Sequence, residues 1–174
     1  MATSYSEVLG GAWQDLPPAV RRSLTSPLLA KGSLDVCPPS GRLARVVARL
    51  IKVPPAGRGV VSSLELNQTG PTTRWIRSFG EMRAVSDQRL VGGSIVESAG
   101  PYQFELVPRV EGNALIVSSG RLRLLGIPAP RWCGPSIVAK LSEGPDELSW
   151  RLGVRIGHPW FGVISQYAGV MRAE

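Results

Sequence analysis

The chain is poor in the residues that build metal centres and disulfide frameworks. Its 174 residues include two cysteines, Cys37 and Cys133, and one histidine, His158. The cysteines are far apart and have no CxxC or His-Cys spacing, so no metal site is expected. Both thiols are expected to be reduced and packed. Phosphate-binding glycine loops and serine-centred catalytic elbows are also absent, and the sequence predicts no cofactor.

A long apolar run is missing as well. No stretch approaches the roughly 20 apolar residues that a helix needs to span a bilayer, so no membrane span is expected. Residues 1–11 lack the basic region followed by an apolar core that marks a secretory signal. The predicted compartment is therefore the cytoplasm.

Lysine is scarce and arginine is abundant. The chain has 3 lysines, 17 arginines and a net charge of +7, a balance that can indicate a nucleic-acid partner. The arginines are spread from Arg21 to Arg172, without the interleaved aromatic residues of RNA-binding proteins. A GC-rich genome also produces such a composition, and no nucleic-acid partner is expected.

The sequence does contain repeated alternation of apolar and polar residues. Every second residue from Tyr102 to Val110 is apolar, and polar residues hold most of the positions between them. A period of two is typical of a strand with one buried face. Residues 147–156 repeat the pattern, with Leu148 and Trp150 at the start of the apolar face.

The same pattern predicts a large antiparallel sheet. Ten strands are expected, at 28–36, 59–67, 72–79, 81–86, 90–98, 102–111, 114–125, 136–142, 147–156 and 161–172. Short turns separate them, among them 87–88 and a tight hairpin at Gly112 and Asn113, and loops this short join antiparallel neighbours. Ten strands exceed what an open sheet holds without curling. The predicted fold is mainly β: a meander curled into a closed or half-open, lipocalin-like barrel, with residues 1–174 in one domain.

Helices are predicted in two places. Residues 1–26 form a helical lead-in that plugs or flanks the sheet. Residues 41–53 form an amphipathic helix that Ser40 caps, with an arginine-rich side and an apolar side of Leu43, Val46, Val47, Leu50 and Ile51. Such a basic helix can lie on an anionic membrane. Packing across the sheet, with the arginines in water, is favoured because no Trp or Phe lies on the apolar side.

The order and spacing of four segments resembles a bacterial family. These are 75–80 (Trp-Ile-Arg-Ser-Phe-Gly), 97–101 (Glu-Ser-Ala-Gly-Pro), 125–130 (Leu-Gly-Ile-Pro-Ala-Pro) and 156–169, which holds Pro-Trp-Phe-Gly and Tyr-Ala-Gly. The pattern is similar to the domain of unknown function 4166, whose members occur alone or fused behind saccharopine-dehydrogenase-like reductases. The resemblance implies a reductase as a candidate partner and supplies no catalytic residues. His158 stands where the pattern has an apolar residue.

Two residues are candidates for chemistry. His158 lies in a Gly-His-Pro turn and could serve as an acid or base near neutral pH, but a plain surface turn residue is the simpler interpretation. Glu97 ends a predicted strand and, if it faces inward, needs a cationic partner to stay charged. Arg77 and Arg109 are the candidate partners, and a structural ion pair between strands is the alternative to chemistry.

A pocket inside the barrel would be walled by large aromatic residues and one arginine. The predicted ligand-binding residues are Trp75, Arg77, Tyr102, Phe104, Trp150 and Tyr167. Such rings suit a flat or polyene-like ligand. They could equally fill the core, because barrels of about eight strands hold only side chains or one small ligand. Ten strands favour a cavity.

Three classes of function are open. The first is a carrier, sensor or chaperone that binds a hydrophobic, polyketide- or lipid-like molecule. The second is a cofactor-independent cyclase or isomerase of the pericyclase type in secondary metabolism, which needs mainly a shaped apolar cavity. The third is a non-catalytic interaction module working with a reductase partner; separately, a homodimer is a candidate assembly. Hydrophobic ligand binding, with cyclase activity as its extension, is favoured; a packed interior with an exposed apolar patch would favour the third class.

Overall fold

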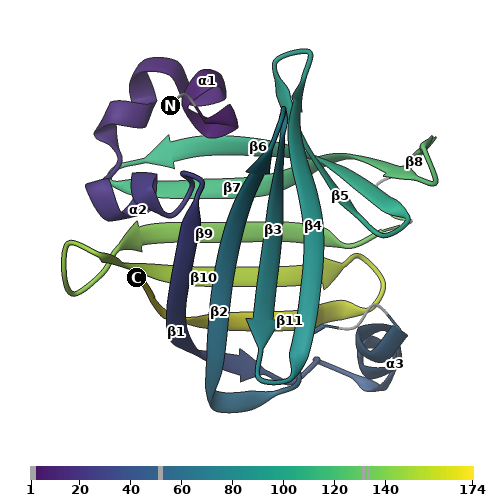
Figure 1. The fold of residues 1–174 in the computed structure, drawn as a ribbon. Coiled ribbons are helices and arrows are strands. Elements are labelled where there is room, and N and C mark those ends of the chain that lie inside the picture. Colours follow the sequence, from purple (N-terminus) through teal and green to yellow (C-terminus); the bar gives the residue numbers. More distant parts are fainter. Residues whose placement is uncertain (1–2, 51–52, 131, 133) are drawn as a thin grey trace.

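Ten antiparallel strands close into a barrel, and a short eleventh strand extends from its edge. The computed structural model describes residues 3–50, 53–130, 132 and 134–174. The strands are β1 (Leu28–Cys37), β2 (Gly57–Thr69), β3 (Thr72–Phe79), β4 (Met82–Val91), β5 (Ser94–Ala99), β6 (Tyr102–Glu111), β7 (Ala114–Leu124), β8 (Ile127–Ala129), β9 (Ser136–Glu143), β10 (Ser149–His158) and β11 (Gly162–Ala173). They pair in the order β6-β5-β4-β3-β2-β1-β11-β10-β9-β7, and a further pairing of β6 with β7 closes the ring. The predicted antiparallel barrel is confirmed, and it is closed (Figure 1).

The tight hairpin between β6 and β7 is confirmed. Glu111 pairs with Ala114, so only Gly112 and Asn113 form the loop. Gly112 has a φ of 61°, which is the left-handed conformation that the first position of a type II′ turn requires. The turn therefore places two long strands side by side with little loop.

One predicted strand boundary is wrong. The break expected at 87–88 does not exist, because β4 runs without interruption from Met82 to Val91. The Asp87 carboxylate accepts hydrogen bonds from the Arg74 guanidinium on β3, at 2.9 and 3.1 Å, instead of bonding to its own backbone in a turn. The chain reverses at Gly92 and Gly93, where both φ angles are positive. Strand β8 also replaces part of a segment that was expected to be a loop.

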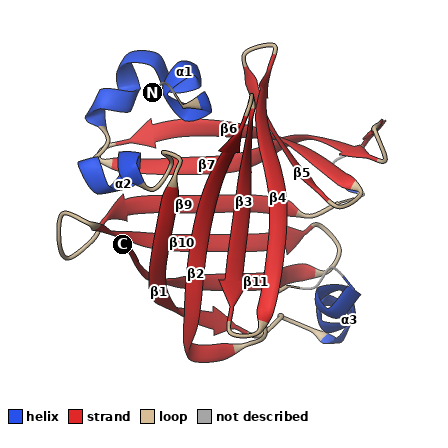
Figure 2. Ribbon diagram, viewed as in Figure 1, coloured by secondary structure: helices blue, strands red, loops and turns tan. Residues whose placement is uncertain are grey.

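The N-terminal helices cover one end of the barrel (Figure 2). They are α1 (Ser4–Leu9), the 3-10 helix η1 (Gly10–Asp15) and α2 (Pro18–Arg22). A capping box between Thr3 and Ser6 starts α1, and Pro18 opens α2 with its φ already helical. Tyr5, from α1, and Val20, from α2, are both buried. The predicted helical lead-in is thus a plug at the end of the barrel that we call the covered end.

The helix α3 (Arg42–Leu50) packs on the outside of the barrel at the opposite end, against β11. Its buried side consists of Ala44 and Ala48, whereas Leu43 and Val46 are 66% and 54% exposed. The prediction that Leu43 and Val46 face the sheet is therefore wrong; Ile51 lies outside the described residues. Small alanine side chains let the helix lie close to β11, whose outward residue Ile164 is fully buried. Ser40 donates its hydroxyl to the Val163 carbonyl at 3.1 Å instead of capping the helix.

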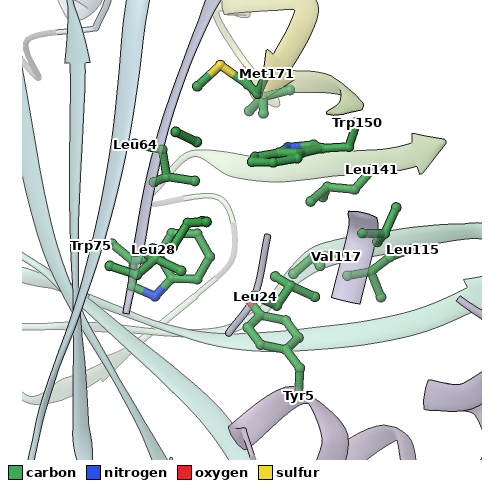
Figure 3. Packing of buried hydrophobic residues seen from close by; sticks show 14 of the residues in the cluster. Tyr5, Leu24, Leu28, Leu64, Trp75, Leu115, Val117, Leu141, Trp150 and Met171 are labelled. Carbon is green, nitrogen blue, oxygen red and sulfur yellow. The ribbon is translucent and has the colours of Figure 1, made fainter. Parts of the chain in front are cut away.

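A single apolar core runs through the interior of the barrel, and Figure 3 shows part of it. Trp150, Leu66 and Leu115 are almost completely buried and come from strands on different sides of the ring. The alternation in β6 is confirmed, since Phe104 and Leu106 are buried while Val107 is exposed. Leu148 is 50% exposed in the turn before β10, so the apolar face predicted for 147–156 begins only at Trp150.

Candidate functional site

Strand pairing brings four polar side chains together on the inner wall of the barrel. On β3, Arg77 lies on the same face as the buried Trp75 and Phe79. The registers place Ser86 opposite Trp75, and Gln88 opposite Glu97. Arg77, Ser86, Gln88 and Glu97 form what we call the inner polar cluster.

The cluster is organised around the Glu97 carboxylate. Its Oε1 accepts a hydrogen bond from Arg77 Nη2 at 3.1 Å and one from Ser86 Oγ at 2.5 Å. Its Oε2 accepts one from Gln88 Nε2 at 3.0 Å. Arg77 Nη1 also donates to Ser86 Oγ at 2.8 Å. The serine hydroxyl therefore bridges the guanidinium and the carboxylate by hydrogen bonds. The predicted pairing of Glu97 with Arg77 is confirmed, while Arg109 pairs with Glu111 on the surface.

The environment keeps both members of the pair charged. Burial alone raises the pKa of Glu97, but the Arg77 charge and the hydrogen bonds from Ser86, Gln88 and Arg77 outweigh burial and hold this pKa below its ordinary value. Burial alone lowers the pKa of Arg77, and the Glu97 charge outweighs it, so the net direction is upward. A carboxylate with a lowered pKa is a weak base and is not a proton donor near neutral pH. The arrangement therefore suits an electrostatic anchor better than acid–base catalysis.

Aromatic side chains surround the cluster. The Arg77 guanidinium carbon lies 5.0 Å from the centre of the Trp75 ring, in a cation–π contact. Burial raises the pKa values of Tyr5 and Tyr167, and the nearby Glu97 charge raises both further. Both phenols therefore stay neutral beside the ion pair.

The charged pair is not sealed from solvent. The side chains of Arg77 and Glu97 are 26% and 16% exposed. The end of the barrel away from α1 has inward-facing residues that are only half-buried, among them Met82, Tyr102 and Ile156. We call this end the open end.

Two hollows among the described residues bear on the site. One, of about 20 Å³, lies at the covered end and is lined by residues that include Tyr5, Trp75 and Gln88; it has room for one water molecule. The other, of about 290 Å³, is an open groove lined by β4–β7 residues that include Glu105 and Arg121. Neither is a ligand-sized cavity at the core of the barrel, so these hollows do not provide the interior cavity that a barrel of ten strands was expected to hold.

The six predicted ligand-binding residues lie on the inner wall, at different depths. Trp75, Phe104, Trp150 and Tyr167 are buried in the core, and Arg77 is in the inner polar cluster. The remaining member, Tyr102, is half-buried and stacks on Phe104 with ring centres 6.0 Å apart. Of the two catalytic candidates, Glu97 joins this set and His158 does not.

His158 belongs to an aromatic cluster on the turn between β10 and β11. Its ring stacks on Phe161 at 4.3 Å, and its Nδ1 accepts a hydrogen bond from the Trp160 backbone N–H at 3.2 Å. Trp160 in turn stacks on Trp132, with centres 5.1 Å apart. His158 therefore shapes this turn, as the simpler interpretation expected.

Sequence reasoning missed three members of the site: Ser86, Gln88 and Tyr5. Ser86 and Gln88 share the inward face of β4, but the wrong turn at 87–88 separated them. Two further inward groups lack a partner among the described residues, namely Trp75 Nε1 and Ser165 Oγ, although both atoms are buried. Period-two alternation through β4 and β11 would have placed Gln88 and Ser165 inward.

Other site types find little support in the described residues. No group of three or more His, Cys, Asp and Glu side chains there could hold a metal ion. Of the described helices, none is long and apolar enough to cross a membrane. Cys37 is free and exposed, contrary to the packed thiol expected, and Cys133 lies outside the described residues.

The fold and site define a class: closed antiparallel β-barrels that carry a charged pair on an otherwise mainly apolar inner wall. The family model "Domain of unknown function (DUF4166)" matches residues 16–171. The chain belongs to this family. A search of curated proteins finds no match. Among solved structures, the chain is similar to a secretary abundant heat soluble (SAHS) protein from Ramazzottius varieornatus, at 7% identity and a TM-score of 0.44, over 84% of this chain and 93% of that one.

Proposed function

We propose that the protein binds a hydrophobic small molecule of the lipid or polyketide type, which enters from the open end of the barrel. The observation that carries this proposal is the solvent-accessible Arg77–Glu97 pair on the inner wall. Ionic groups on an apolar wall are costly unless they are paired and hydrogen-bonded, and apolar sites with a few fixed polar groups are typical of small-molecule binding.

The open end offers the chemistry for an amphipathic ligand. The half-buried Tyr102 ring stacks on the buried Phe104 ring and offers a flat apolar surface there. The Ser165 hydroxyl is buried without a partner among the described residues, so a polar group of the ligand could bond to it. The hollow at the covered end, of about 20 Å³, is too small for such a ligand, so the proposal places the ligand at the open end.

Catalysis has less support than binding. A cyclase or isomerase of the cofactor-independent type would need a group that exchanges protons or stabilises charge during the reaction. Glu97 already accepts three hydrogen bonds and has a lowered pKa, so it holds no proton to donate. Positioning of a reactive substrate by the aromatic wall is the remaining catalytic route.

The test combines native mass spectrometry of freshly purified protein with a thermal shift against a panel of fatty acids, isoprenoids and polyketides. A ligand at 100 times its Kd should stabilise the protein by about 2.7 kcal/mol, which raises Tm by about 5–10 °C in a chain of this length. Repeated absence of both a co-purifying ligand and a thermal shift would refute the proposal.

A pair of variants localises the site. Ala84 lies opposite Arg77 on the inner face of β4, and Val85 lies on the outer face. Ala84→Phe should fill the open end and remove the thermal shift, while Val85→Phe adds the same ring outside and should leave it unchanged. Circular dichroism checks that both variants fold. Equal ligand shifts in the two variants would place any binding outside the barrel.

A further inference from the structure

The surface of α3 carries apolar side chains that the fold leaves in solvent. Leu43 and Val46 are 66% and 54% exposed, and they lie one turn apart on the same side of the helix. The residues of this helix that are buried against the barrel are Ala44 and Ala48. Stability of the barrel therefore does not explain the larger aliphatic residues.

Positive charge surrounds these two side chains. Arg42, Arg45 and Arg49 are exposed on the same helix, which contains no acidic residue. Among the described residues, no carboxylate lies within ion-pair distance of these three guanidinium groups. The charges are thus free to meet an anionic surface.

The segment that leads into this helix is joined to the turn that carries one of a pair of exposed indoles. The backbone N–H of Ser40, just before α3, donates to the Val163 carbonyl at 2.9 Å, which ties the start of α3 to the β10–β11 turn (Figure 1). Trp160 in that turn is 65% exposed and stacks on Trp132, which is 51% exposed. The predicted membrane signal lacked aromatic residues on the helix itself, and the fold supplies them from neighbouring loops.

We propose that this end of the molecule docks on the surface of an anionic lipid bilayer. Leu43 and Val46 would enter the boundary between headgroups and acyl chains, about 5–10 Å deep. Indole rings favour the same interfacial layer, and the three arginines would lie at the level of the lipid phosphates. The protein has a net charge of +7, and the apolar residues of α3 are interspersed with arginines. An anionic lipid surface complements both features, and for this reason we propose lipid as the partner of this surface. This proposal does not depend on ligand binding inside the barrel.

Vesicle co-sedimentation tests it with the full chain. Vesicles of phosphatidylcholine with 30% phosphatidylglycerol should bind the protein roughly a hundredfold more tightly than pure phosphatidylcholine, since each of three arginines contributes roughly fivefold. Raising the salt to about 0.5 M should remove most of this difference. Brominated acyl chains should quench tryptophan fluorescence, and Trp160→Phe combined with Trp132→Phe should abolish that quenching.

Matched variants assign the surface. Leu43→Ser combined with Val46→Ser should weaken vesicle binding at least roughly tenfold, because two aliphatic side chains leave the interface. Leu148→Ser removes an equally exposed leucine beyond the covered end and should have no effect. Either of two results would overturn the proposal: equal binding to both vesicle types, or a dimer in sedimentation velocity that the paired serine variant converts to monomer. The second result would assign the surface to contact between copies of the chain.

Discussion

The inner ion pair makes a sharp prediction about stability. Arg77→Met removes the cation and leaves the Glu97 carboxylate with hydrogen bonds from Ser86 and Gln88 alone. Breaking a buried pair from one side costs about 3–5 kcal/mol. The 26% and 16% exposure of the two side chains lets water compensate in part, so we expect a loss of about 2–3 kcal/mol in the free energy of unfolding.

The partner variant and the double variant complete a cycle. Glu97→Gln keeps the shape of the side chain but leaves Arg77 without a counter-charge, and we expect a loss of about 2 kcal/mol. In the double variant neither charge remains, so the losses should not add, and the coupling free energy should be about 1–3 kcal/mol. Urea unfolding at pH 7, followed by tryptophan fluorescence, measures all four proteins.

The same cycle has a pH dependence whose sign follows from Glu97. Its pKa is lowered in the folded state, so its stabilisation is fully present above the unfolded value of about 4.3 and is lost as the pH falls through the folded pKa. The difference in unfolding free energy between wild type and Glu97→Gln should therefore shrink below about pH 4. A constant difference across the acid range, or losses that add to within about 0.5 kcal/mol, would refute the reasoning.

Three further predictions concern packing and alkaline pH. Gly169→Ala places a Cβ on the Ser33 carbonyl oxygen of β1 and should cost about 3 kcal/mol or more in urea unfolding, while Gly153→Ala, with nothing within 4 Å, should be neutral or slightly stabilising. Trp150→Ala should cost about 3–5 kcal/mol by the same measurement, because Trp150 is 1% exposed; a loss below about 1 kcal/mol would contradict the packed core. The raised pKa of Tyr5 means that wild type should lose stability as pH rises above about 10; Tyr5→Phe should lose less, and equal alkaline losses would show that Tyr5 is not responsible.

The sequence predicts the barrel well because most of its strands have one face in water. Alternation of period two in β6, from Tyr102 to Val110, directly encodes which side chains are buried. The predicted boundary at 87–88 is wrong because Asp87 alone carries the turn signal there, and Asp is typical of turns. In the fold, the Asp87 carboxylate pairs with Arg74 across two strands, which is a long-range contact that local residue preferences do not reveal.

The sequence predicts contacts within the site only where a buried charge needs an opposite charge. An inward Glu97 requires a cation, so electrostatics predicts Arg77 or Arg109 as its partner, and only the structure selects Arg77. The contributions of Ser86 and Gln88 depend on the register of β4 with its neighbours, and a one-residue slip would turn both outward. Tyr5 reaches the cluster from a helix that packs across the end of the barrel, and no sequence periodicity links the two.

The orientation of α3 shows where hydrophobicity alone misleads. Burying Leu43 and Val46 would remove more apolar area from water than burying Ala44 and Ala48, so a helix placed only by area would turn its leucine side inward. In the structure, the alanine side of the helix packs against β11 instead. The small side chains of Ala44 and Ala48 allow the helix to approach the strand closely. The aliphatic side is then left in solvent at the open end of the barrel. A lipid surface that covered this helix would also stand at the opening of the barrel, so an apolar ligand could pass from the bilayer to the inner wall without crossing water.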